Sequence, residues 1–309
     1  MKISIITPCY NEQENILECY EAIYALFEGD LRGYTREHIF IDNCSNDASE
    51  SILREIAGAD SAVKVIFNAR NFGPHRSPLH GIFSATGDCV IPVVCDLQTP
   101  ISLIPEFVDH WERGFKIVFG IRVSMGESTL VQFLRKAYYR AMEFLAGYPH
   151  INGFIGFGLF DRSVIEQMRR RASGFPYFRA LVFEVAGASA SIPYVQPTRR
   201  RGVSKQRVID LIDFSINGVV TSGRIPIRLM TLIGVVAAIV SFLTSVGYLV
   251  AKLIWWDSFS AGIAPIISGV FFFCGLQLVF IGLIGEYIGV LTEKVSNPPL
   301  VIERSRVNF

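Results

Sequence analysis

The chain has 309 residues, half of them hydrophobic, and its 29 Lys and Arg residues almost balance its 28 Asp and Glu residues. This length accommodates one sizeable domain and a small membrane module. The six cysteines lack C-x-x-C spacing, which argues against a zinc site or a disulfide framework. Residues 1–12 predict a strand rather than a signal peptide, because polar residues and Pro8 interrupt the apolar run.

Short apolar runs and segments of helical period alternate along the chain as far as residue 119. The expected strands are 3–6, 39–41, 63–67, 90–94 and 117–119, and the expected helices are 12–26, 48–56, 78–85 and 103–113. This alternation predicts an α/β domain with a mostly parallel, Rossmann-like sheet. Such a sheet binds ligands beyond the carboxyl ends of its strands. The polar segments that follow the strands are 10–12, 42–43, 68–71 and 96–98.

Two charge-free apolar stretches, 229–251 and 258–285, follow later in the chain. Each is long enough to cross a bilayer, which takes roughly 20 apolar residues. The link between them carries Lys252 and Asp257, whereas basic residues gather outside both stretches. By the positive-inside rule, we expect a two-helix transmembrane hairpin with both flanks and both termini in the cytoplasm.

These patterns divide the chain into four parts. They are a cytoplasmic α/β domain at 1–205, a juxtamembrane interfacial helix within 206–228, two transmembrane helices in 229–290 and a cytoplasmic tail at 291–309. The interfacial helix is expected at 208–220, between a basic cluster and the first span. Another helix, expected at 130–145, has a mixed face that either packs on the sheet or rests on lipid headgroups.

Five segments, taken together and in order, resemble the motifs of family 2 glycosyltransferases, which have the GT-A fold. They are IITPCYNE at 5–12, IDNCSND at 41–47, NARNFG at 68–73, DLQTP at 96–100 and RRRGVSK at 199–205. More narrowly, the chain resembles the membrane-anchored branch that contains dolichyl-phosphate mannose synthase and the bacterial polyprenyl-phosphate glycosyltransferases. The likeness covers nearly the whole chain, including 280–289 near its end.

The resemblance implies a site for a nucleotide-diphosphate sugar. It places Pro8, Tyr10 and Glu12 around the nucleoside, and Asp42 at the base. A carboxylate there accepts a hydrogen bond from a ring N–H, which favours uracil or guanine. The other interpretation of Asp42, and of Asp47, is that they cap the helix that follows, since Asp is common at helix N-termini.

The resemblance also implies a divalent cation, Mg or Mn, that bridges the diphosphate and stabilises charge on the departing nucleotide. It assigns Asp96 and Gln98 to the metal and makes Asp96 a catalytic residue. The chain departs from the family pattern here, since Val94 and Thr99 stand where carboxylates are usual. Metal binding is then expected to depend on Asp96, Gln98, water and the diphosphate. The alternative is that Asp96 caps a turn at the strand end.

A second departure lies in 152–162, where Gly156 and Gly158 replace an Asp and an Arg of the mannose synthase pattern. A hydroxyl acceptor needs a general base, whereas a polyprenyl phosphate is ionised at neutral pH and attacks unaided. The glycines thus favour a phosphate acceptor, and they are similar to a sub-branch of O-antigen and polysaccharide enzymes. Asp161 is expected to cap the helix 163–170 rather than to act as a base.

An anionic lipid headgroup needs cations near the membrane interface. The residues that we expect at the acceptor phosphate are Arg122, Arg199, Ser204 and Lys205, and further candidates are Arg135, Arg179 and Arg201. Arg122 is also expected to act in catalysis. The alternative is a juxtamembrane basic patch that attracts anionic lipids, worth roughly 1 kcal/mol per charge.

Together these features predict an integral membrane enzyme, an inverting glycosyltransferase that moves a hexosyl or related sugar from a nucleotide diphosphate to a polyprenyl phosphate. The expected partners are the nucleotide sugar, the polyprenyl-phosphate lipid and the membrane, but not nucleic acid; the resemblance leaves a homo-oligomer open. One rival is a transferase to a lipid or glycan hydroxyl, with Glu184 as its base. Another is a catalytically silent scaffold that binds nucleotide sugars, suggested by Val94 and Gly156. The sequence does not identify the sugar.

Overall fold

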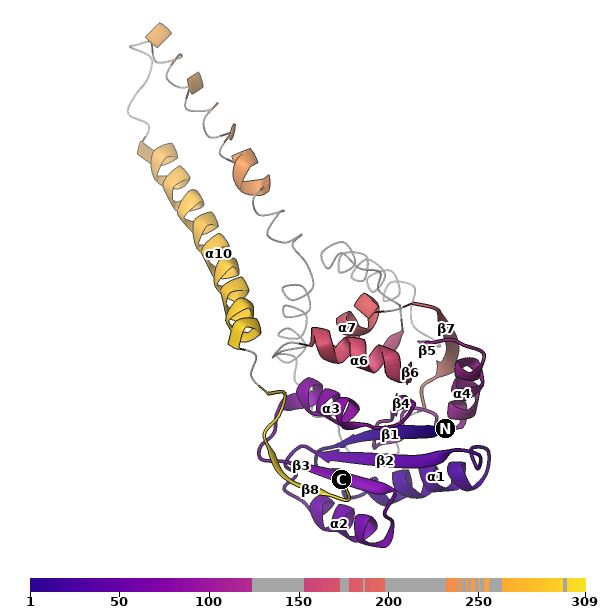
Figure 1. The fold of residues 1–309 in the computed structure, drawn as a ribbon. Coiled ribbons are helices and arrows are strands. Elements are labelled where there is room, and N and C mark those ends of the chain that lie inside the picture. Colours follow the sequence, from indigo (N-terminus) through magenta and orange to yellow (C-terminus); the bar gives the residue numbers. More distant parts are fainter. Residues whose placement is uncertain are drawn as a thin grey trace.

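The computed structural model describes residues 1–123, 153–172, 178–185, 187–197, 263–296 and 299–309, with shorter stretches between 232 and 255. In this part of the chain, one eight-stranded sheet has the order β7-β5-β6-β4-β1-β2-β3-β8 (Figure 1). Its strands are β1 (Lys2–Cys9), β2 (Thr35–Asp42), β3 (Val63–Asn68), β4 (Cys89–Pro92), β5 (Ile117–Val123), β6 (Phe154–Asp161), β7 (Ser189–Val195) and β8 (Glu303–Val307). The helices are α1 (Ile16–Glu28), α2 (Ser49–Ala59), α3 (Gly73–Ser84), α4 (Ile104–Glu112), α6 (Arg162–Arg171), α7 (Phe178–Val185) and α10 (Ile263–Ser296), with a 3-10 turn at Ile101–Leu103.

The centre of the sheet is parallel, as the sequence predicts. β1 lies between β2 and β4 and is parallel to both, β3 continues this order beside β2, and β5 pairs in parallel with β7. All the strands and helices expected up to residue 119 are present, so the α/β class is confirmed. β6 runs antiparallel to β4 and β5, and β8 runs antiparallel to β3, which makes the sheet mixed. The sequence did not predict β6, β7 or β8.

Helices cover both faces of the sheet, because successive strand residues point to opposite sides. Ile5 packs in one buried cluster with Phe27 of α1 and Phe107 of α4. Its neighbour Ile6 packs in another cluster, with Leu79 of α3 and Ile165 of α6. Figure 1 shows α3, α6 and α7 on one side of the sheet and α1 and α2 on the other. The result is a three-layer domain with its core on both sides of the central strands.

Several element boundaries differ from those expected, and three of the differences have a clear local cause. α1 begins at Ile16 rather than at 12, because the residues just before it form a turn that is bonded to the β2–α2 loop. α3 begins at Gly73 rather than at 78, with Pro74 in the first turn, where a missing N–H costs nothing. β4 ends at Pro92, which has no N–H for the ladder.

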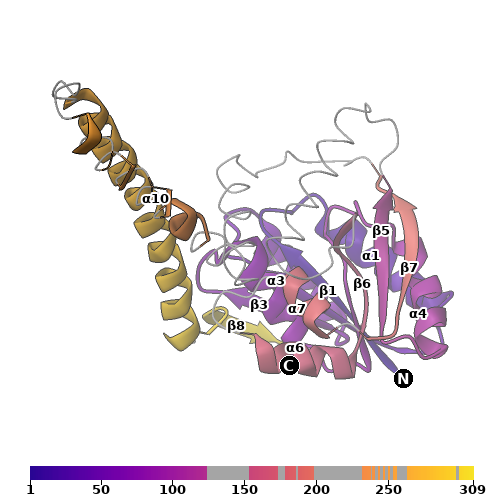
Figure 2. The same ribbon diagram turned by 90° about the horizontal axis from the view of Figure 1, so that it is seen from above.

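The C-terminal helix α10 extends away from the sheet domain (Figures 1 and 2). Within it, Phe272–Gly289 is the one stretch of the described residues that is long and apolar enough to cross a membrane. The earlier stretch 229–251 is described only in part. There Gly234 lies against α10, since a Cβ on this glycine would lie 3.7 Å from Cε2 of Phe280. The helices expected at 130–145 and 208–220 lie outside the described residues.

The end of the expected tail 291–309 belongs to the sheet. β8 pairs antiparallel with β3, with Val307 opposite Val65 and Glu303 opposite Asn68. The side-chain amide of Asn308 donates to the carbonyl oxygens of Ala57 and Val63, at 2.7 and 2.8 Å. The chain therefore returns from α10 to the edge of the domain in which it began.

Candidate functional site

The loops that follow β1 and β2 are joined by hydrogen bonds at the carboxyl edge of the sheet. The backbone N–H of Asn11 donates to Oγ of Ser45 at 2.8 Å, and its side-chain oxygen accepts from the N–H of Asn46 at 2.7 Å. The N–H of Glu12 donates to Oγ of Ser49 at 3.1 Å. These bonds place the predicted nucleoside residues Pro8, Tyr10 and Glu12, which are half-buried, directly beside the loop that contains Asp42.

The backbone of these loops adopts left-handed conformations at residues other than glycine. Asn11 has φ 53°, Cys44 has φ 63° and Leu97 has φ 56°, and they follow β1, β2 and β4 respectively. Such values are uncommon for residues with a side chain, most of all for one as bulky as leucine. Strained backbone of this kind clusters at active sites and ligand clamps. The strain therefore marks the same edge that the sheet topology indicates.

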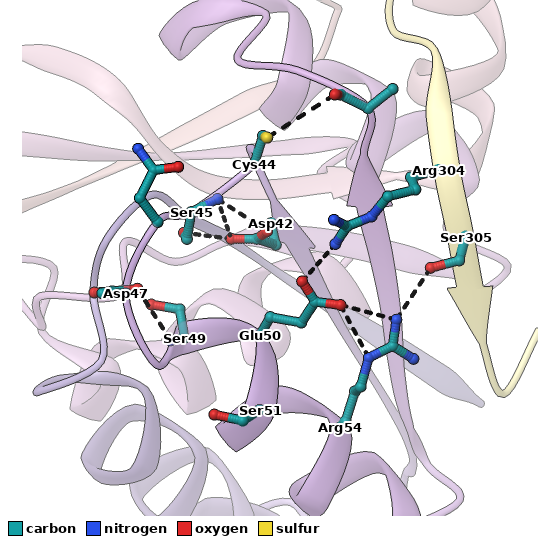
Figure 3. Close-up of polar contacts among 12 residues, drawn as sticks. Asp42, Cys44, Ser45, Asp47, Ser49, Glu50, Ser51, Arg54, Arg304 and Ser305 are labelled. Atoms are coloured by element: carbon teal, nitrogen blue, oxygen red, sulfur yellow. Dashed lines mark hydrogen bonds and ion pairs between the residues drawn. The ribbon is translucent and has the colours of Figure 1, made fainter.

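Asp42 is buried at the end of β2 and is the centre of a tight turn. Its carboxylate accepts from the N–H of Ser45, at 3.2 and 3.3 Å, and from the Ser45 hydroxyl at 2.5 Å. Burial raises the pKa of Asp42, while the Ser45 bonds and the Arg304 charge act in the opposite direction. Figure 3 shows Arg304 of β8 bonded to Glu50 beside this turn. Asp42 does not cap α2, whose N-cap position is Ala48.

Asp47 instead serves the local structure. Its carboxylate accepts from the N–H groups of Ser49, at 3.0 Å, and of Gln13, at 3.3 Å. Burial acts to raise the pKa of Asp47, but these hydrogen bonds outweigh it and lower the pKa. The structural interpretation of Asp47 therefore holds.

An amide network supports the loop that follows β3. Asn68 is buried and donates to the side-chain oxygen of Asn43 at 3.1 Å and to Ser77 at 2.9 Å. Asn43 in turn donates to Asn71 at 2.8 Å and accepts from the N–H of Phe72 at 2.9 Å. The predicted motif 68–73 is thus held against the end of β2.

The loop after β4 is connected to the ends of β5 and β7. Asp96 is half-buried and accepts the N–H of Gln98 at 3.2 Å. The side-chain oxygen of Gln98 accepts from Nε2 of Gln196 at 3.1 Å, and Oε1 of Gln196 accepts from Arg122 at 2.9 Å. The structure thus brings together Asp96 and Gln98, expected at the metal, and Arg122, expected at the acceptor phosphate; Asp96 and Arg122 are also the expected catalytic residues. Gln196, which connects them, was missed.

Comparison with known proteins identifies the chain. Residues 4–172 match the family described as "Glycosyl transferase family 2". The chain belongs to this family. The "SfII prophage-derived bactoprenol glucosyl transferase" of Shigella flexneri is 30% identical to this glycosyltransferase over 307 residues, which cover 99% of this chain and 98% of that protein. The "Prophage bactoprenol glucosyl transferase homolog" of Escherichia coli (strain K12) is 29% identical over 306 residues, 98% of this chain and 99% of that protein.

A solved structure has the same fold. Glucosyl-3-phosphoglycerate synthase from Mycobacterium tuberculosis in complex with uridine diphosphate matches the glycosyltransferase with a TM-score of 0.50 and 19% sequence identity, over 71% of this chain and 78% of that one. At this identity the likeness concerns the fold alone. It agrees with the expected GT-A architecture of the sheet domain.

The described residues of the glycosyltransferase supply only part of the ligand set of a divalent cation. In the described part of the chain, no cluster of three or more His, Cys, Asp or Glu side chains could hold an ion by itself. The side chain of Val94 has no ligand atom, and Thr99 is buried. Neither residue therefore replaces the carboxylate that the family pattern has there. Asp96 supplies one carboxylate and Gln98 a carbonyl oxygen, which are hard ligands of the kind that Mg and Mn take. The diphosphate and water would complete the coordination.

The backbone explains why the glycosyltransferase has glycines in β6. Gly156 has φ 110°, a conformation that other residues rarely adopt. A Cβ on Gly158 would lie 2.4 Å from the carbonyl oxygen of Val118 in β5. An Arg at 158 would therefore require a different path of β6, and an Asp at 156 would be strained.

Two of the remaining predicted residues, Asp161 and Glu184, make local contacts, and three others lie outside the described residues. Asp161 caps α6, as expected: its side chain accepts from the N–H of Ser163 at 3.0 Å, and also from Trp111 at 2.8 Å. Glu184 in α7, the base that a hydroxyl acceptor would require, lies 3.7 Å from the guanidinium of Arg171. The predicted acceptor residues Arg199, Ser204 and Lys205 lie outside the described residues.

Proposed function

We propose that the chain is an inverting glycosyltransferase that moves a hexose, with glucose as the first candidate, from a nucleotide-diphosphate sugar to a polyprenyl phosphate. The observation that carries the proposal is the connection between Arg122 and the loop of Asp96 and Gln98. It joins the residue expected at the acceptor phosphate to those expected at the diphosphate. The names of the full-length relatives, bactoprenol glucosyl transferases, support glucose and a polyprenyl acceptor.

In this proposal, the loops that follow β1 and β2, which hydrogen bonds connect, bind the nucleotide. Asp42 accepts a hydrogen bond from the base, and the end of β1 with Pro8, Tyr10 and Glu12 surrounds the nucleoside. Asp96 and Gln98 would hold Mg or Mn, which when bound would stabilise charge on the leaving nucleotide. The αL backbone after β1, β2 and β4 holds these side chains in place before the substrate arrives.

The acceptor enters as an anion and needs orientation rather than deprotonation. Arg122, and beyond the described residues Arg199, Ser204 and Lys205, bind its phosphate oxygens, since charged hydrogen bonds to phosphate are strong and directional. The positive φ of Gly156 disfavours the acidic side chain that the mannose synthase pattern has at this position. An ionised phosphate attacks the anomeric carbon from the side opposite the nucleotide, which inverts the configuration there.

The position of β8 supports a transmembrane hairpin. β3 and β8 pair in one sheet, so the chain before 229 and the chain after α10 lie on the same side of any membrane. A single crossing by α10 would separate them, which supports our proposal that 229–251 forms a second crossing. The proximity of Gly234 to Phe280 agrees with two adjacent antiparallel spans. Both termini and the sheet domain are then cytoplasmic.

The function is tested with purified protein in detergent or vesicles, supplied with UDP-glucose, Mg or Mn, and either a polyprenyl phosphate or the matching polyprenol. We expect transfer to the phosphate and none to the alcohol, with the product bond inverted. Other nucleotide sugars, tested in the same way, establish the sugar. Transfer to the polyprenol alone would favour the hydroxyl-acceptor enzyme, and failure to bind any nucleotide diphosphate would favour the silent scaffold.

The topology is tested separately with an epitope tag placed either between 252 and 257 or after Phe309. The first tag should be accessible only from outside intact cells, and the second only from inside-out vesicles. Access to both tags from the same side would refute the hairpin.

A further inference from the structure

Three polar side chains form a continuous chain of hydrogen bonds across the carboxyl edge of the sheet. Arg122 lies near the end of β5, Gln196 directly follows β7, and Gln98 lies in the loop after β4. Nη1 of Arg122 donates to Oε1 of Gln196 at 2.9 Å, and Nε2 of Gln196 donates to Oε1 of Gln98 at 3.1 Å. The end of β7 therefore touches both halves of the proposed reaction centre.

The direction of these bonds is fixed by chemistry. A guanidinium group only donates, so Gln196 must turn its carbonyl oxygen toward Arg122. The amide nitrogen of Gln196 then faces Gln98, and Gln98 must present its own carbonyl oxygen in return. A carbonyl oxygen has two lone pairs, of which this bond uses one. The second lone pair of the Gln98 oxygen remains for a cation. Arg122, acting through Gln196, therefore determines how Gln98 is oriented as a metal ligand.

The strand that carries Gln196 is firmly placed. β7 pairs with β5 along its whole length, with Tyr194 opposite Arg122. Tyr194 is buried and packs edge-on against Phe157 of β6, with 5.6 Å between the ring centroids. Gln196 itself is half-buried two residues later. Its amide thus extends from a rigid support rather than from a long free loop.

We propose that Gln196 is a positioning residue of the transfer reaction, which orients the carbonyl oxygen of Gln98 for the divalent cation and holds Arg122 for the acceptor phosphate. The inference rests on the proposed function and deepens it, because one amide then sets the geometry on both sides of the bond that is made. Groups that orient a metal ligand in this way typically change metal affinity by about 10 to 100 times when they are removed.

The test compares Gln196→Leu with the wild-type protein by two measurements. Binding of Mn²⁺ to the protein with UDP, followed by electron paramagnetic resonance without turnover, should weaken about tenfold. The KM for polyprenyl phosphate should rise several-fold. Gln167→Leu, at an exposed position of α6, is the matched control and should change neither value. The melting temperatures should agree among all three proteins.

Two double-mutant cycles separate positioning from simple structural damage, since residues that act through one another are non-additive. In a Gln98→Ala background, Gln196→Leu should no longer weaken Mn²⁺ binding. In an Arg122→Ala background, it should no longer raise the KM for the acceptor. Gln196→Glu keeps an acceptor for Arg122 but offers Gln98 no N–H, so it should weaken Mn²⁺ binding as Gln196→Leu does.

Additive effects in both cycles, or a lowered melting temperature with unchanged Mn²⁺ binding and acceptor KM, would overturn the inference. A failure of the proposed function would give a different experimental result. In that case the wild-type protein itself would show no cation-dependent binding of nucleotide or no transfer to a polyprenyl phosphate, and the inference would fall with it.

Discussion

The two ends of the central sheet use the same chemical group, a carboxylate, in opposite ways. At the amino end, Glu37 of β2 is 1% exposed and accepts hydrogen bonds from Lys64 at 2.8 Å, from Lys2 at 3.0 Å and from the Thr86 hydroxyl at 2.7 Å. At the carboxyl end, Asp96 is half-buried in a loop and accepts the N–H of its own loop neighbour Gln98. Glu37 thus accepts hydrogen bonds from residues that are distant in the sequence, whereas Asp96 lies at the surface of the candidate site.

The backbone shows the same difference. The loops at the carboxyl ends of β1, β2 and β4 contain three of the four non-glycine residues with positive φ in the described part of the chain, namely Asn11, Cys44 and Leu97, whereas the fourth, Asn308, follows β8 at the amino edge. The amino end of the sheet therefore contributes stability. The carboxyl end is strained, at some cost in stability, and this strain holds side chains in a fixed arrangement. Substitutions at the two ends should therefore affect different measured quantities.

The sharpest contrast is expected from Asp96→Ala. If Asp96 holds the cation that stabilises the leaving nucleotide, its loss should lower kcat by about a thousandfold, which corresponds to about 4 kcal/mol. The melting temperature should stay within a few degrees of the wild-type value. Asp109→Ala, which removes an exposed carboxylate paired with Arg113, is the control and should leave turnover unchanged. Normal turnover of Asp96→Ala would refute the assignment.

Glu37→Ala should give the reverse result. It leaves Lys64, which is only partly exposed, without its partner at the amino end. Removing one member of a buried ion pair costs roughly 3 kcal/mol or more, so the free energy of unfolding should fall by about this amount. The KM for the nucleotide sugar, measured well below the melting temperature, should not change. A raised KM with unaltered stability would contradict the division between the two ends.

The pH dependence of stability offers a smaller but independent test. Burial acts to raise the pKa of Glu37, but hydrogen bonds from Lys64, Ser4 and Thr86 outweigh it and lower the pKa to about 2, from an ordinary value of 4.5. Because the folded pKa is the lower one, the contribution of Glu37 is complete above the ordinary value and is lost as the pH falls toward 2. The stability difference between wild type and Glu37→Gln should shrink by about 2 kcal/mol from pH 6 to pH 3, as measured by denaturant titration. A constant difference would show that Glu37 is not held ionised.

The smallest effect is expected from Gly156→Asp, which restores the acidic residue of the mannose synthase pattern. With φ at 110°, an Asp here is strained and should cost about 1 kcal/mol of stability. It should not improve transfer to a polyprenyl phosphate. Gly187→Asp, in an open position of the domain, serves as the control for added charge. Faster transfer by Gly156→Asp would show that the missing acid limits the enzyme.

The sequence predicted the central fold and the edge that carries the site, because both follow from local patterns. Apolar runs at strand length predict the parallel order, and the parallel order predicts that residues such as Asp42 and Asp96 share one edge. β8 has no such pattern: its residues, ERSRV, are mostly polar, and it is a strand only because the edge of β3 is there to pair with. Gln196 was missed for a related reason, since its partner Gln98 lies 98 positions earlier in the chain.

The pairing of β8 with β3 also sets an order on biosynthesis. β8 follows α10 in the chain, so the edge of β3 stays uncovered until α10 and the residues after it have been synthesised. Uncovered strand edges recruit other chains and lead to aggregation. A chain that stops between α10 and β8 would therefore keep this edge open.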